Sequence, residues 1–170
     1  MPILGRGTIA NAITDRSWYT YLCFGVSNRT LLTDRERERE TFRIWNTKDE
    51  GMIVYISSLA VYHSPETEYA KHKIDMENLI KARFKNYCIL RIGNVTWDND
   101  NPNTLLNFLR DKIEKNEPFE IQNTYRYLTD KDEFTHWIDL IPAKGKHEMN
   151  VTGRKFKVSE IVEMIKNKEL

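Results

Sequence analysis

The sequence predicts an α/β fold, a three-layer α/β/α sandwich with a mostly parallel sheet, and two observations carry that prediction. Expected strands and helices alternate along the whole chain of 170 residues, which is typical of parallel strands joined by helical crossovers. The expected strands are near-continuous apolar runs, as in a sheet that is covered on both faces. No linker, internal repeat or low-complexity segment divides the chain, so we expect one domain over residues 1–170.

Apolar periodicity and turn residues place the individual elements. Strands are expected over residues 2–4, 18–26, 52–57, 87–93, 119–122 and 148–153. Helices are expected from Thr8 and over residues 33–47, 64–84, 103–116, 131–141 and 158–166. The 64–84 helix places Ala70, Ile74, Leu79 and Ile80 on one side. The 33–47 helix alternates arginine and glutamate at i,i+3 spacing (35–38, 36–39 and 37–40), which predicts a solvated face.

Composition excludes several classes of function. The net charge is +1, from 26 basic and 25 acidic residues, so no general attraction to nucleic acid or to an anionic membrane is expected. Cys23 and Cys88 form no C-x-x-C pair, so we expect neither a metal site nor a redox dithiol, but buried free thiols. No apolar run reaches the roughly 18 residues that span a bilayer, and the N-terminus lacks a signal-peptide pattern. These features favour a cytoplasmic protein.

A glycine-rich loop follows the first expected strand. Gly5, Gly7 and Ala10 have G-x-G-x-x-A spacing at the start of a helix, the context that a dinucleotide-binding turn requires. Gly5 permits the tight turn, Gly7 leaves room for a pyrophosphate, and Ala10 lets helix and strand approach. The alternative is a turn that only connects two elements. The loop predicts a Rossmann-like fold with these cofactor contacts: Gly5, Arg6, Gly7, Thr8, Ile9 and Ala10.

A Tyr-x-x-x-Lys pair follows the expected strand 52–57. Tyr69 and Lys73 have this spacing, but so do Tyr127 and Lys131, so the spacing alone is weak. Only Tyr69 follows a buried strand that ends in serines, Ser57 and Ser58. A phenol has a pKa of about 10, and an ammonium group one helical turn away favours its ionised form. A serine hydroxyl nearby can hydrogen-bond a substrate oxygen whose charge changes.

The stretch from 53 to 95 resembles the short-chain dehydrogenase/reductase superfamily. "ISSLAVY", "YAKHKIDMENLI" and "ILRIGNV" resemble its extended, NAD-dependent epimerase/dehydratase-like branch in particular. The resemblance implies that Ser58 and Tyr69 are catalytic and that Lys73 is the partner of Tyr69 and a contact of the cofactor ribose. It also implies that Tyr69, Ser57, Ile92 and Gly93 line the nicotinamide pocket and that Asn94 contacts substrate.

The chain is shorter than extended members of this superfamily, and the segment 18–26 has two interpretations. In the first, it is the second strand of the Rossmann sheet. Ser27 then stands where a ribose-binding acid is expected, and Arg29 suggests a 2′-phosphate on the cofactor. Alternatively it is a later strand whose end passes the nicotinamide, with Ser27 and Asn28 as cofactor contacts. We prefer the second interpretation, a compact form that lacks part of the Rossmann sheet. The choice between NAD and NADP stays open, and residues 95–147 leave room only for a minimal substrate-binding region.

These features predict an NAD(P)-dependent oxidoreductase or epimerase. The substrate is expected to be a small molecule such as a nucleotide-linked sugar, acted on at a hydroxyl or carbonyl, with Arg126 as a candidate contact of a substrate phosphate. His63 and His72 are expected to be surface residues. The alternative is a non-catalytic module that binds a nucleotide or a protein, and a homodimer is left open.

Overall fold

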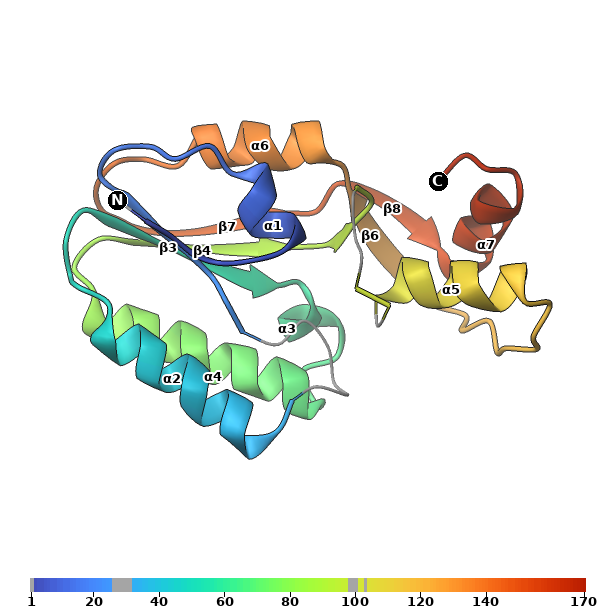
Figure 1. Cartoon of the computed structure of the whole chain (residues 1–170), viewed down its shortest axis with the longest axis horizontal. Coiled ribbons are helices and arrows are strands. Elements are labelled where there is room, and N and C mark those ends of the chain that lie inside the picture. The colour runs from blue at the N-terminus through green and yellow to red at the C-terminus, as the bar shows by residue number, and fades with distance from the viewer. Residues whose placement is uncertain (1, 26–31, 98–100, 103) are drawn as a thin grey trace.

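The computed structural model describes residues 2–25, 32–97, 101–102 and 104–170 of the chain, and Figure 1 shows the whole arrangement. The strands are β1 (Ile3–Gly5), β2 (Tyr19–Cys23), β3 (Met52–Ser58), β4 (Tyr87–Ile92), β5 (Asn94–Val95), β6 (Tyr125–Thr129), β7 (Lys146–Val151) and β8 (Arg154–Lys157). The helices are α1 (Thr8–Ala12), α2 (Asp34–Asn46), α3 (Ala60–His63), α4 (Glu68–Arg83), α5 (Leu105–Glu114), α6 (Lys131–Asp139) and α7 (Val158–Lys166).

The main sheet has five parallel strands in the order β1-β2-β3-β4-β7. Helices α1 and α6 cover one face of this sheet, and α2 and α4 cover the other (Figure 1). The central strands are buried on both faces because both faces carry helices, which explains their near-continuous apolar sequence. The predicted three-layer α/β/α sandwich with a reduced, mostly parallel sheet is therefore confirmed.

The position of β2 decides between the two interpretations of residues 18–26. β2 lies between β1 and β3. In the Rossmann strand order 3-2-1-4-5-6, the second strand pairs on the outer side of the first, and the fourth strand pairs on its inner side. β2 therefore occupies the place of a fourth strand, as the preferred interpretation predicts. Among the described residues, no strand pairs with the outer edge of β1.

The two crossovers on either side of β2 differ in hand. The chain steps in one direction along the sheet from β1 to β3, but α1 and α2 lie on opposite faces. The crossovers β1–α1–β2 and β2–α2–β3 are therefore of opposite hand. Crossovers between parallel strands are almost always right-handed, so one of these two crossovers is an exception, as the interpretation that intervening strands are absent would predict.

A second, smaller sheet projects beyond the carboxyl edge of the main sheet (Figure 1). Its order is β5-β6-β8, with β5 and β6 parallel and β6 and β8 antiparallel. Helices α5 and α7 pack on it through a separate apolar cluster that includes Leu109, Leu128 and Ile161. Because β8 and α7 also form part of this lobe, it draws on residues beyond the predicted range 95–147.

The sequence patterns misplaced three features of the fold. No strand forms over 119–122, and β5, β6 and β8 were not predicted, because short, polar strands carry little apolar signal. The expected helix 64–84 begins only at Glu68, with Thr67 as the N-cap of α4, and the short helix α3 precedes the expected range. The buried side of α4 also differs from the apolar pattern, since Ile74 and Leu79 are only half-buried whereas Lys73 and Glu77 are buried.

Candidate active site

A cavity of about 690 Å³ lies at the carboxyl edge of the main sheet, between that sheet and the second lobe. Its size suits a small-molecule or cofactor site. The glycine loop contributes Gly7, Thr8 and Ile9 to its lining, and the β3–α4 region contributes Ser58, Tyr69 and Lys73. The structure thus brings the two predicted motifs, which lie about 50 residues or more apart in sequence, to the wall of one cavity.

The geometry of the glycine loop explains its two glycines. Gly5 and Gly7 both have positive φ angles, 141° and 104°, which side chains with a Cβ rarely adopt. A Cβ at Gly5 would also clash with the backbone carbonyl of Cys23, so Gly5 permits the close pairing of β1 with β2. A Cβ at Gly7 would meet nothing within 4 Å, because this residue faces the open space of the cavity. Ala10 is buried.

The helix after this loop is short. α1 has 5 residues and begins with Gly7 as its N-cap, without a side-chain cap. The N–H groups of a first helical turn have no partner within the helix, so the loop offers donors to a bound anion. The macrodipole of such a short helix is small. An anion at this loop would therefore be attracted mainly by the local N–H groups and by Arg6.

The two serines at the end of β3 have different surroundings. Ser58 is half-buried, and its Oγ accepts a hydrogen bond of 3.1 Å from the backbone N–H of Ala60. Its own O–H can still donate. Ser57 is buried, and its Oγ donates to Glu77 Oε1 at 2.6 Å. Both serines line the cavity. Among the described contacts, the Ser57 O–H already donates a hydrogen bond, whereas the Ser58 O–H does not.

Lys73 is held by a buried network that the sequence patterns did not predict. Its Nζ donates to the Tyr55 hydroxyl at 2.9 Å and to Glu40 Oε1 at 3.2 Å. Tyr55 in turn donates to Glu40 Oε1 at 2.8 Å. Glu40 and Lys73 are 2% and 4% exposed. An ammonium group has three donors, so these contacts leave Lys73 at most one for a ligand in the cavity.

The charges in this network stabilise one another. Burial alone would raise the pKa of the Glu40 carboxyl, but the charge of Lys73 and hydrogen bonds from His72 and Tyr55 lower that pKa to about 2. Burial would lower the pKa of Lys73, yet Tyr55, Glu40 and Tyr69 together raise it above its ordinary value. Glu40 and Lys73 therefore form a charged pair. The negative charge of Glu40 offsets part of the positive charge that Lys73 presents to Tyr69.

Two expectations about these residues are wrong. His72 is not at the surface but 2% exposed, with its Nε2 at 2.9 Å from Glu40 Oε2. Glu40 does not pair with Arg37, which instead binds Glu68 at 3.0 Å. The reason is that α4 packs beside α2 on the same face of the sheet, so that Glu40 faces inward. The expected pair of Glu36 and Arg39 is present, at 3.5 Å.

The end of β4 forms another side of the cavity. Ile92, Gly93 and Asn94 line it, and Asn94 Nδ2 donates to the Tyr127 carbonyl at 3.2 Å. A Cβ at Gly93 would lie 2.7 Å from that same carbonyl, so glycine allows β6 to approach. Arg126 also lines the cavity, with its guanidinium donating to the Gln122 side chain at 3.0 Å.

Ser27, Asn28 and Arg29 lie outside the described residues. His63 is exposed as expected and stacks on Tyr127 at 5.2 Å between ring centroids. Cys23 and Cys88 are free thiols, and burial raises the pKa of each to about 12.

Two features are absent from the described residues. These residues contain no group of three His, Cys, Asp or Glu side chains suited to a metal ion. They also contain no helix with the length and apolar character needed to cross a membrane.

Several solved structures with a similar fold hold NAD together with a nucleotide or nucleotide sugar. MoeE5 in complex with UDP-glucose and NAD has a TM-score of 0.71, 18% identity, and coverage of 89% of this chain and 62% of that chain. UDP-glucuronic acid 4-epimerase from Bacillus cereus, with UDP-glucuronic acid and NAD, has a TM-score of 0.68 and 16% identity, over 89% and 59%. WbmG from Bordetella bronchiseptica, with NAD and UDP, has a TM-score of 0.69 and 13% identity, over 89% and 56%.

These likenesses show a shared fold. The chain has the Rossmann-type fold of enzymes solved with NAD and sugar nucleotides, in a compact form that spans 56–62% of their length. No protein-family model and no curated protein sequence matches the chain. The predicted resemblance to short-chain, epimerase/dehydratase-like enzymes is therefore supported by the fold, whereas the roles of individual residues stay predictions.

Proposed function

We propose that the protein is an NAD(P)-dependent oxidoreductase or epimerase that acts on a hydroxyl or carbonyl of a nucleotide-linked sugar or similar small molecule. The observation that carries the proposal is the single cavity lined both by the glycine loop and by Ser58, Tyr69 and Lys73. The structural neighbours that were solved with NAD and UDP-sugars support the same class of ligand.

The residues of the cavity fit a dinucleotide. The open space beside Gly7 and the donors of the first turn of α1 suit a pyrophosphate. Ile92 and Gly93, at the end of β4, carry no charged group and suit a nicotinamide ring. When bound, the dinucleotide supplies hydride transfer.

The chain itself supplies the proton and the orientation. Tyr69 donates a proton to a substrate carbonyl, or accepts one from an alcohol, in its role as general acid/base. The hydroxyl of Ser58 donates a hydrogen bond to the same substrate oxygen, where charge develops. Lys73 stabilises the phenolate of Tyr69, with Glu40 holding the ammonium group in place.

Substitution of Tyr69 by phenylalanine tests the proposal, because it removes only the hydroxyl. We expect turnover of UDP-glucose or UDP-glucuronic acid with NAD(P) to fall by roughly 10²–10⁴-fold, the usual contribution of a general acid/base. The matched control is Tyr125→Phe, an exposed residue of β6 outside the cavity lining. Equal turnover in wild-type and Tyr69→Phe protein would remove Tyr69 from the mechanism.

A second candidate function is a binding module without turnover. The pairing of Lys73 with Glu40 favours it, because the Glu40 carboxylate offsets part of the positive charge that Lys73 would present to Tyr69. Melting-temperature titrations with NAD, NADH, NADP and NADPH separate the candidates when combined with turnover, since a ligand that binds only the native state raises the melting temperature. Dinucleotide binding without turnover of any nucleotide sugar would favour the module.

A further inference from the structure

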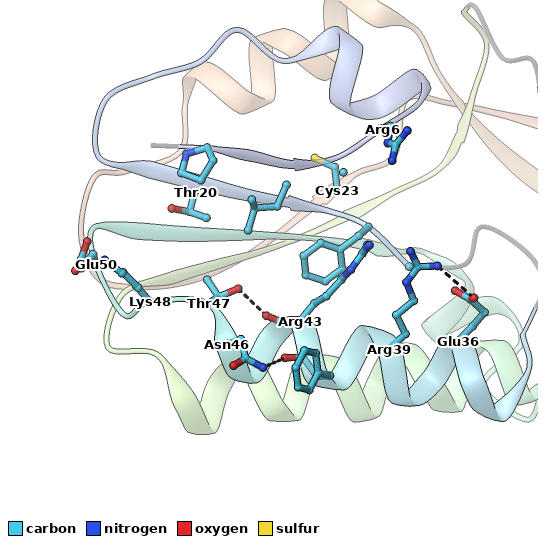
Figure 2. A pocket seen from close by; sticks show the side chains of 16 residues that line it. Arg6, Thr20, Cys23, Glu36, Arg39, Arg43, Asn46, Thr47, Lys48 and Glu50 are labelled. Atoms are coloured by element: carbon cyan, nitrogen blue, oxygen red, sulfur yellow. Dashed lines mark hydrogen bonds and ion pairs between the residues drawn. The ribbon is translucent and has the colours of Figure 1, made fainter.

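Figure 2 shows a second cavity, which shares Arg6 with the candidate active site. Its volume is about 740 Å³. Arg6, Cys23, Phe24 and Gly25 line both cavities, so the two spaces adjoin at the carboxyl ends of β1 and β2. The remaining lining comes mainly from β1 and from α2.

The α2 side of this second cavity is basic. Arg39 and Arg43 are both exposed, are one helical turn apart, and extend from α2 toward the sheet in Figure 2. The Arg43 guanidinium carbon lies 5.4 Å from the centroid of the Phe24 ring, which holds it against the cavity floor. Arg39 binds Glu36 at 3.5 Å. Lys48 and Glu50, which follow the C-terminal end of α2, also line the cavity.

The absence of a described strand on the outer side of β1 bears on how the protein would bind an adenosine ribose. In a Rossmann dinucleotide site, an acid about 20 residues beyond the glycine loop binds the 2′-hydroxyl of the adenosine ribose, and an arginine takes its place when a 2′-phosphate is bound. That acid follows the strand on the outer side of β1, and the described sheet has no strand there. The second cavity lies on the α2 side of β1 and β2, next to the glycine loop, and is bordered by Arg6, Arg39 and Arg43.

We propose that the second cavity holds the adenosine half of the dinucleotide and that Arg39 and Arg43 select the 2′-phosphate, so that the protein prefers NADP(H) to NAD(H). This inference rests on the proposed function and adds the cofactor preference to it. The guanidinium groups suit a phosphate because they present several donors in a planar fork. Glu36 opposes this selection by pairing with Arg39, so the preference depends on Arg39 exchanging its carboxylate partner for the phosphate.

Equilibrium binding of NADPH, NADH, adenosine 2′,5′-bisphosphate and AMP tests the inference. We expect NADPH to bind wild-type protein at least about tenfold more tightly than NADH, the effect of one or two charge-assisted hydrogen bonds. The double variant Arg39→Gln/Arg43→Gln should lose this preference, and Glu36→Gln should increase it. The control is Arg35→Gln, an exposed arginine of α2 outside the lining of either cavity, which should leave it unchanged.

The outcomes separate this inference from the proposed function. Equal affinity for NADPH and NADH, or a preference that survives the double variant, overturns the inference and leaves the proposed function standing. If no dinucleotide binds but adenosine 2′,5′-bisphosphate binds better than AMP in an Arg39- and Arg43-dependent way, the subsite stands and the proposed function fails. If none of the four ligands binds, both are overturned. Melting curves confirm that the variants fold.

Discussion

Two buried carboxylates lie under neighbouring strands of the same sheet face, and they are paired differently. Glu40 of α2 binds the ammonium group of Lys73, the ring of His72 and the hydroxyl of Tyr55. Glu77 of α4 is 4% exposed and binds the guanidinium of Arg91 through both oxygens, at 2.8 and 2.5 Å.

The difference lies in what each network reaches. Arg91 of β4 continues to Glu148 of β7 and to the Tyr62 hydroxyl, both at 2.6 Å, so the Glu77 network joins α4 to two strands. The Glu40 network ends at Lys73, whose side chain lines the cavity. Both carboxylates stabilise the fold, because a charge is buried at low cost only when it is paired. The Glu77 network also reaches the cavity, through Ser57, but only Glu40 is paired with a charged side chain, Lys73, that lines the cavity.

The largest expected effect separates these two roles. Glu40→Gln should destabilise folding by about 3–5 kcal/mol, because it leaves the buried ammonium group of Lys73 without its charged partner. Glu77→Gln should cost less, because Arg91 keeps its ion pair with Glu148. Chemical denaturation measures that loss. Among molecules that remain folded, only Glu40→Gln should change the pH profile of turnover, since it changes the charge beside Lys73 and Tyr69. If Glu77→Gln altered the pH profile as much as Glu40→Gln, the two networks would have the same effect on the candidate active site.

The acid side of the stability curve sharpens the same contrast. The pKa of Glu40 is lowered in the folded state from 4.5 to about 2. A lowered folded-state pKa contributes stability that is fully present above the unfolded value and is lost as the pH falls from about 4.5 toward 2, roughly 3 kcal/mol in all. Denaturation titrations across this range should show a shallower loss in Glu40→Gln than in wild-type protein. Parallel curves for the two proteins would contradict the charged state of Glu40.

The smallest expected effect comes from an ion pair outside both networks. Lys166 of α7 binds Glu163 at 2.8 Å, with both side chains at least half exposed. Lys166→Gln should change the free energy of unfolding by about 0.5 kcal/mol at most, because solvent screens an exposed pair. A loss comparable with that of Glu40→Gln would mean that burial does not distinguish these pairs.

The sequence predicted the parts of the fold that depend on local patterns. Apolar strands, the glycine loop and the α2 boundaries follow from nearby residues, and the placement of β2 followed from its resemblance to a later strand. The inward face of α4 could not be predicted in this way, because Lys73 and Glu77 look like surface residues until their partners are known. Those partners, Glu40 and Arg91, come from other elements, 33 and 14 residues away in the chain. A signal was present in the alternating charges of α2, but it equally fits a solvated helix.

A crystal structure with bound NADPH tests the central claim most directly. We predict the pyrophosphate beside Gly7, the nicotinamide between Gly93 and Tyr69, and the 2′-phosphate within reach of Arg39 or Arg43. A dinucleotide bound elsewhere, with its pyrophosphate away from the glycine loop and its nicotinamide away from Tyr69, would contradict the account.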